Sequence, residues 1–232
     1  MSLSKLNLFN SYFEMSLYAA KFTAELILNS SSTFSISFPG GSSPLLYFKI
    51  LADLPSLYNH WNRVLIFQGD ERFVKPPSPY LNSKLIEDNF LNFVPYLKPK
   101  FFKINTSISH IKKSAIDYTS LMSTLLQNDS NGFPNFDLVV LGIGNDGHTA
   151  SIFPESEALY SASLSYIPVH PPTTSQPYLP RITMTMPLIN SAKNKIFLLS
   201  GPKKNSLLKS MDNSSPFNHV KYPKFFASIH DK

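Results

Sequence analysis

Short apolar runs alternate with amphipathic stretches along most of this chain. Runs of this kind predict strands at Thr33–Phe38, Arg63–Gln68, Asp137–Leu141 and Lys195–Ser200. In Asp137–Leu141 the apolar side chains occupy successive positions, which is typical of a strand covered on both faces within a parallel sheet. In residues 11–29 and 111–127 the apolar positions recur with the helical period, so each predicts an amphipathic helix.

Weaker patterns complete the predicted order of elements. Further strands are expected at Phe101–Ile104 and Ser165–Val169, and Phe225–Ala227 is expected to be an edge strand. Further helices are predicted at 44–52, 82–92, 187–192 and 203–210. For the first of these, Ser43 is the predicted N-cap and Pro44 the first helical residue. Strands alternating with helices predict an α/β fold with a doubly wound, parallel sheet. With no internal repeat and no linker, residues 1–232 are expected to form a single domain.

The stretch from Asp137 to Pro154 carries the strongest chemical signal. Its strand breaks into three glycines, Gly142, Gly144 and Gly147, and Asp146 and His148 flank the last of them. Glycine-rich loops let backbone N–H groups approach a ligand closely. In parallel sheets the ligand crevice lies beyond the carboxyl ends of the strands. We therefore expect the active site here, with His148 at its centre.

The three glycines also fit the dinucleotide-binding pattern GxGxxG, but the surrounding sequence argues against that function. The pattern must open a long helix, followed by a second strand that ends in an acidic residue. Here Pro154 limits any helix to a turn or two, and residues 163–170 contain no acid. The sequence therefore gives no support for NAD binding.

Four loops at predicted strand ends converge on the same edge of the sheet: Gly40–Ser42, Asp70–Arg72, Asn145–His148 and Gly201–Lys204. The first and last lead into helix N-termini, which attract anions. Asp70–Arg72 is read either as a solvated turn or as part of a site. Taken together, the loops supply a glycine nest, cations and an acid–base group, a combination that suits a phosphorylated substrate.

Composition and charge remove several classes of function. The chain has 232 residues, no cysteine and a net charge of +6. No block of five like charges and no nucleic-acid motif occurs, so the charge is interpreted as a basic surface or as a preference for an anionic small substrate. The other histidines lack HxH or HExxH spacing, and there is no GxSxG, so neither a metal site nor a serine-hydrolase elbow is expected. No apolar stretch is long enough for a membrane span, no signal peptide is recognisable, and a cytoplasmic monomer is the simplest expectation.

These residues together resemble the 6-phosphogluconolactonase family. The matching segments occur in family order from about residue 35 to 205, and they are Gly40-Gly41-Ser42 with Pro44, Trp61, Asp70-Glu71-Arg72, Asn82, the block Gly142–Pro154, Arg181-Ile182-Thr183, and Gly201 with Lys204. The resemblance implies a Rossmann-like, three-layer α/β/α fold with a mostly parallel sheet, shared with glucosamine-6-phosphate deaminases. It also implies hydrolysis of 6-phospho-D-glucono-1,5-lactone to 6-phosphogluconate in the oxidative pentose phosphate pathway, without a cofactor.

The resemblance also suggests roles for individual residues. His148 is expected to activate water, and Asp146 either orients the imidazole or binds a sugar hydroxyl. Arg72 and Lys204 match the family's phosphate-binding positions, and Arg181 is a further candidate. The expected substrate-binding set is Gly40, Gly41, Ser42, Asp70, Arg72, Arg181 and Lys204.

Two rival functions remain at the level of the sequence. The related deaminases have a motif similar to DGHIAFNEP, whose glutamate falls where this chain has Phe153, and they usually have Asp-Glu-Tyr where this chain has Asp70–Arg72. A non-catalytic sugar-phosphate-binding protein is the other alternative. Intact Asp146, His148 and Arg72 argue against it.

Overall fold

The computed structural model describes residues 6–130, 132–200 and 215–228, which form two sheets. The larger sheet has seven strands, and every neighbouring pair in it is parallel. In spatial order these strands are β1 (Leu6–Phe9), β10 (Lys224–Ser228), β9 (Asn194–Ser200), β6 (Leu138–Leu141), β2 (Phe34–Phe38), β3 (Val64–Gln68) and β5 (Lys100–Phe101). The predicted α/β class with a mostly parallel sheet is confirmed.

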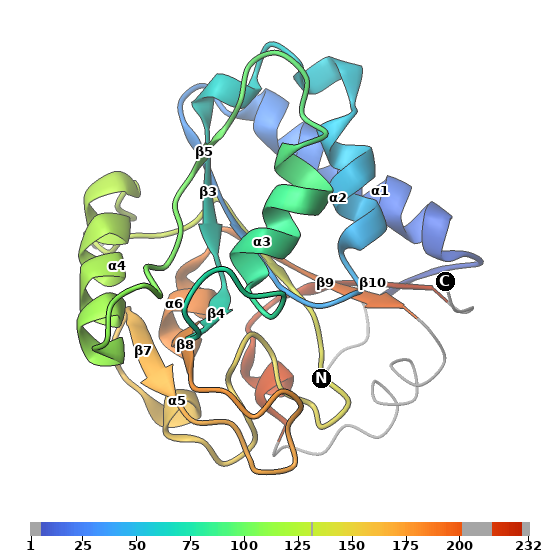
Figure 1. The fold of residues 1–232 in the computed structure, drawn as a ribbon. Helices are drawn as coiled ribbons and strands as arrows, with labels where there is room; N and C mark the ends of the chain where they lie inside the picture. Colours follow the sequence, from blue (N-terminus) through green and yellow to red (C-terminus); the bar gives the residue numbers. More distant parts are fainter. Residues whose placement is uncertain (1–5, 131, 201–214, 229–232) are drawn as a thin grey trace.

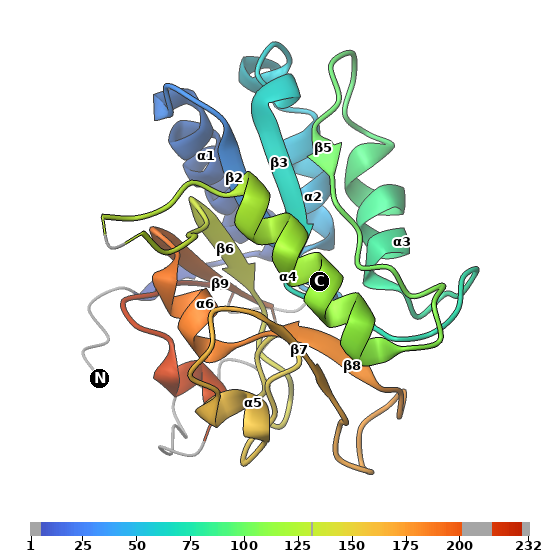
Figure 2. The same cartoon turned by 90° about the vertical axis from the view of Figure 1, so that its left-hand side faces the viewer.

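Helices cover both faces of the large sheet (Figures 1 and 2). One face carries α1 (Tyr12–Asn29), α2 (Leu45–Ala52) and α3 (Asn82–Ile86), which continues as a π-helical segment over Glu87–Leu91. The other carries α4 (Ile111–Leu125) and α6 (Met186–Ser191). The short α5 (Glu157–Tyr160) lies below them in Figure 2. None of the helices in the described part of the chain is long and apolar enough to cross a membrane.

Two hydrophobic clusters fill the space between the sheet and its helices. Successive residues of a strand point to opposite faces, so Val64 and Ile66 enter the cluster under α1 and α2. Leu65 and Phe67 enter the cluster under α4. We call these the α1-side cluster and the α4-side cluster. This two-sided burial explains why the strands of the large sheet are apolar on successive positions.

A smaller, antiparallel sheet of three strands lies at the carboxyl end of β3. It contains β4 (Asp70–Arg72), β8 (Arg181–Met184) and β7 (Tyr166–Val169), in that order. The sequence predicted the strand over Ser165–Val169. The prediction of one doubly wound sheet did not include a separate, smaller sheet. Its position places Arg72 and Arg181 beside the loops that follow β2 and β6.

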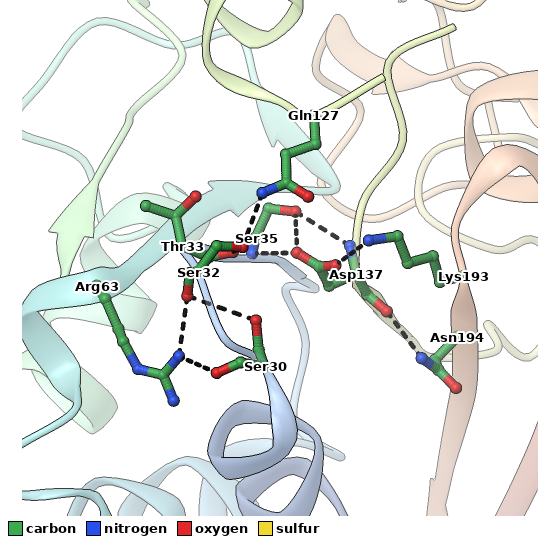
Figure 3. Close-up of polar contacts among 9 residues, drawn as sticks. All are labelled: Ser30, Ser32, Thr33, Ser35, Arg63, Gln127, Asp137, Lys193 and Asn194. Carbon is green, nitrogen blue, oxygen red and sulfur yellow. Dashed lines mark hydrogen bonds and ion pairs between the residues drawn. The ribbon is translucent and has the colours of Figure 1, made fainter. Parts of the chain in front are cut away.

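A polar network links the amino-terminal ends of the central strands (Figure 3). These strand ends lie opposite the loops that line the site. Asp137 Oδ2 accepts hydrogen bonds from the backbone N–H of Ser35 at 2.8 Å and from its hydroxyl at 2.9 Å. Lys193 Nζ donates to Asp137 Oδ1 at 2.7 Å. Nearby, the guanidinium of Arg63 donates to the carbonyl of Ser30, the C-cap of α1. These contacts fix the starts of β2, β6 and β9 relative to one another.

Two local predictions are wrong, each because of a contact distant in sequence. Helix α2 begins at Leu45, with Pro44 and not Ser43 as the N-cap. The hydroxyl of Tyr12 accepts from Leu46 N at 3.1 Å, so a residue of α1 caps the first turn of α2. The second error concerns Phe225–Ala227, which is not at the sheet edge, because β1 pairs outside β10.

Candidate active site

A cavity of about 480 Å³ opens at the carboxyl ends of β2 and β6, next to the small sheet. Three of the four predicted loops contribute to its wall, and the fourth, Gly201–Lys204, lies outside the described residues. The predicted site residues in the wall are Gly40, Gly41, Ser42, Asp70, Arg72, His148 and Arg181. The structure therefore brings together in this wall all the predicted site residues that it describes except Asp146, which contacts His148.

Asp146 and His148 form a tight pair in the loop after β6. Asp146 Oδ1 lies 2.5 Å from His148 Nδ1 and accepts the backbone N–H of His148 at 3.2 Å. Burial alone would raise the pKa of Asp146, but the hydrogen bond and charge interaction with His148 outweigh burial and lower it. A carboxylate held at Nδ1 favours the proton on that nitrogen, which leaves Nε2 as the acceptor for proton transfer. This geometry favours the orienting role of Asp146 over direct binding of a sugar hydroxyl.

Two glycines allow the loop to close this tightly. A Cβ at Gly144 would lie 2.2 Å from Nδ1 and Cε1 of His148, so any side chain there would displace the ring. Gly147 has φ +84°, a left-handed conformation that other residues rarely adopt. The backbone N–H of Gly144 donates to the carbonyl of His148 at 2.8 Å, which completes the turn. The glycines thus fix the position of His148 and also allow a ligand to approach the loop.

Asp70 and Glu71 are buried in the structure, with only 4% and 0% of their surface exposed. The alternative that Asp70–Arg72 is a solvated turn is therefore wrong. Asp70 Oδ2 accepts from the hydroxyl of Ser151 at 2.5 Å, and Asp70 Oδ1 accepts from Asn82 Nδ2 at 3.1 Å. The carboxylate of Glu71 accepts the first backbone N–H groups of α3, those of Asn82 and Ser83, at 2.7 and 2.8 Å. These bonds join β4, α3 and the loop that carries His148.

Arg72 and Arg181 face one another across the pair of strands β4 and β8, as directly paired residues. Arg72 Nη1 donates to the carbonyl of Tyr80 at 2.8 Å, and Arg181 Nη2 donates to that of Pro177 at 3.4 Å. The Nε atom of each is buried and has no partner among the described residues. Like charges directly opposite in a sheet are destabilising. The wall of the cavity therefore presents two cations that an anion would stabilise.

Sequence reasoning gave no role to two residues of this wall. Gln176 lines the cavity, and Asn82 lines it as well as holding Asp70. Gln176 belongs to the proline-rich loop after β7, where no local pattern pointed to a ligand. Asn82 was part of the resemblance but was given no role. The part of the chain that the structure describes holds no group of three or more histidine or acidic side chains placed to bind a metal ion.

Comparison with known families agrees with this geometry. The family model for glucosamine-6-phosphate isomerases and 6-phosphogluconolactonases matches residues 14–227, nearly the whole chain. A 6-phosphogluconolactonase of Synechocystis is 33% identical over 176 residues, which cover 75% of this chain and 69% of the relative. The chain belongs to the 6-phosphogluconolactonase family.

Solved structures extend the agreement to the fold. The 6-phosphogluconolactonase of Trypanosoma brucei superposes with a TM-score of 0.83 at 25% identity, covering 97% of this chain and 95% of the other. A monomeric glucosamine-6-phosphate deaminase superposes with a TM-score of 0.78 at 20% identity, covering 98% of this chain and 97% of the other. At that identity the deaminase shows only the shared fold. The fold of this chain is thus the one found in solved 6-phosphogluconolactonases.

Proposed function

We propose that this chain hydrolyses 6-phospho-D-glucono-1,5-lactone to 6-phosphogluconate, with His148 as the general base that activates water. One observation carries the proposal. His148, which pairs with Asp146, lines the same cavity as Arg72 and Arg181. A base and a pair of cations in one cavity suit a substrate with an ester at one end and a phosphate at the other.

The reaction follows from this arrangement. A water molecule attacks C1 of the lactone while His148 Nε2 takes its proton, and the carbonyl oxygen becomes an oxyanion. The bond between C1 and the ring oxygen then breaks, and the imidazolium returns the proton to that oxygen, which becomes the hydroxyl of the open chain. Asp146 stabilises the imidazolium in the interval, because its pKa is low enough to keep it ionised. Backbone N–H groups of the glycine loops are the candidate donors to the oxyanion.

The phosphate end is assigned to the arginines and to the start of α2. Arg72 and Arg181 supply charge-assisted hydrogen bonds, which arginine forms especially well with phosphate. The loop Gly40–Ser42 leads into α2, whose N-terminus adds a favourable dipole. Lys204 remains a proposed phosphate ligand, and it lies outside the described residues. Through these contacts the phosphate would hold C1 at a fixed place relative to His148.

The test is a comparison of two histidine variants with the wild type. His148→Ala should lower kcat for the phosphorylated lactone by about 10²–10⁴-fold, the usual effect of losing a general base. His110→Ala is the matched control, because His110 is exposed at the N-cap of α4. Its kcat should equal that of the wild type. A folded His148→Ala protein with near-normal kcat would remove His148 from the mechanism.

A further inference from the structure

Phe153 is a buried hydrophobic residue next to the active site. Its side chain is 1% exposed, yet it lies in neither the α1-side nor the α4-side cluster. Among the buried hydrophobic residues that the structure describes, only Leu81 shares this property. A fully buried phenyl ring normally contributes to core packing. The described neighbours of the Phe153 ring therefore bear on its role.

Two of these neighbours are polar residues of the active site. The ring of Phe153 lies 4.9 Å from the imidazole of His148, centroid to centroid, with the planes inclined at 49°. The guanidinium carbon of Arg181 lies 5.5 Å from the centroid of the same ring, within the range of a cation–π interaction. One phenyl ring thus contacts both the base and a cation of the cavity wall.

Arg181 depends on this ring more than a surface arginine would. It is 4% exposed, its Nε has no partner among the described residues, and its Nη2 makes one long hydrogen bond of 3.4 Å. Burial lowers the pKa of Arg181, and the attraction of the Asp70 carboxylate offsets only part of that effect. The negative face of an aromatic ring offsets part of that cost, and an aliphatic side chain of similar volume does not.

We propose that Phe153 is a positioning residue that supports the His148 imidazole and the Arg181 guanidinium on its ring and so sets the distance between the base and the anion-binding end of the cavity. The inference rests on the proposed function, because it assigns Arg181 to the phosphate. It predicts that removing the ring changes both KM and kcat. A merely structural phenylalanine would change stability alone.

Phe153→Leu is the decisive variant, and Phe136→Leu is its matched control. Phe136 is 0% exposed and belongs to the α4-side cluster, so the control removes a buried ring away from the site. Losing a desolvated cation–π contact should raise KM by about 3- to 30-fold. Losing support for the imidazole should lower kcat by about 10- to 100-fold, because small misplacements of a catalytic group have large effects. Phe136→Leu should lower only the melting temperature.

A second readout is independent of activity. The ¹⁵N chemical shifts of the His148 ring report which nitrogen carries the proton. In the wild type they should show one dominant tautomer, and in Phe153→Leu, where the unsupported ring can turn away from Asp146, they should show exchange between two. If Phe153→Leu does not fold, nuclear Overhauser contacts between the Phe153 and His148 rings in the wild type replace this comparison.

The outcomes separate this inference from the proposed function. Wild-type protein that hydrolyses no lactone would contradict the proposed function, and the tautomer measurement would still decide the role of Phe153. Phe153→Leu with the KM, kcat and His148 shifts of the wild type would overturn the inference. Absent Overhauser contacts between the two rings in the wild type would overturn it as well.

Discussion

Replacing Asp146 by asparagine removes one charge from the site and tests the role that the sequence left open. The carboxylate oxygen lies 2.5 Å from His148 Nδ1 and also accepts the backbone N–H of His148. An amide oxygen of the same shape still accepts both bonds. It cannot stabilise the positive charge that the imidazole carries after taking a proton from water.

The size of the effect follows from the geometry. At an effective dielectric constant of about 20, two unit charges about 4 Å apart attract one another by ~4 kcal/mol. The Asp146 side chain is 45% exposed, so solvent screening lowers this value, and we take about 1.5–3 kcal/mol, the usual contribution of a hydrogen bond to a charged group. Because about 1.4 kcal/mol corresponds to a factor of ten, kcat should fall by about 10- to 150-fold. KM should hardly change, since the lost charge interaction develops only in the transition state.

The assay is steady-state hydrolysis of the phosphorylated lactone, corrected for spontaneous opening. Asp117→Asn serves as the control, because Asp117 pairs with Lys113 on the exposed surface of α4. That variant should match the wild type in both constants. If Asp146→Asn changes KM and leaves kcat intact, Asp146 binds a substrate hydroxyl and the orienting role is refuted.

Three further predictions concern the phosphate, the glycine loop and the amino-terminal edge of the sheet. Arg72→Ala should raise KM for the phosphorylated lactone by about 10- to 150-fold while barely affecting unphosphorylated glucono-lactone, and an equal loss on both substrates would remove Arg72 from the phosphate site. Gly144→Ala should lower kcat by about 10²-fold, because its Cβ would displace His148. Gly142→Ala, whose Cβ meets nothing within 4 Å, should lose much less activity, and equal losses would argue against the displacement. Asp137→Ala should destabilise the fold by about 2–4 kcal/mol in urea unfolding without changing KM, since it leaves the buried Ser35 N–H without its carboxylate. Unchanged stability would mean that the network in Figure 3 contributes little.

The sequence predicted the central strands of the large sheet and the helices that cover it, because these carry their own periodic patterns, but it missed β1. It could not predict β4, because three consecutive charged residues have no apolar alternation. Asp70 and Glu71 are buried only because Asn82, Ser83 and Ser151 supply hydrogen-bond donors from segments distant in sequence. The glycine loop identified the position of His148, but its pairing with Asp146 depends on backbone geometry. The cap of α2 could not be predicted from the local sequence either, because the capping side chain, Tyr12, belongs to another helix.

The central claim is that this protein opens a phosphorylated sugar lactone. The most direct measurement is the rate at which the purified protein converts freshly prepared 6-phospho-D-glucono-1,5-lactone to 6-phosphogluconate, with the spontaneous rate subtracted. The account predicts a rate that is proportional to protein concentration and is lost in His148→Ala, with no ammonia released from glucosamine 6-phosphate under the same conditions. A wild-type rate equal to that of buffer alone, or steady release of ammonia, would contradict it.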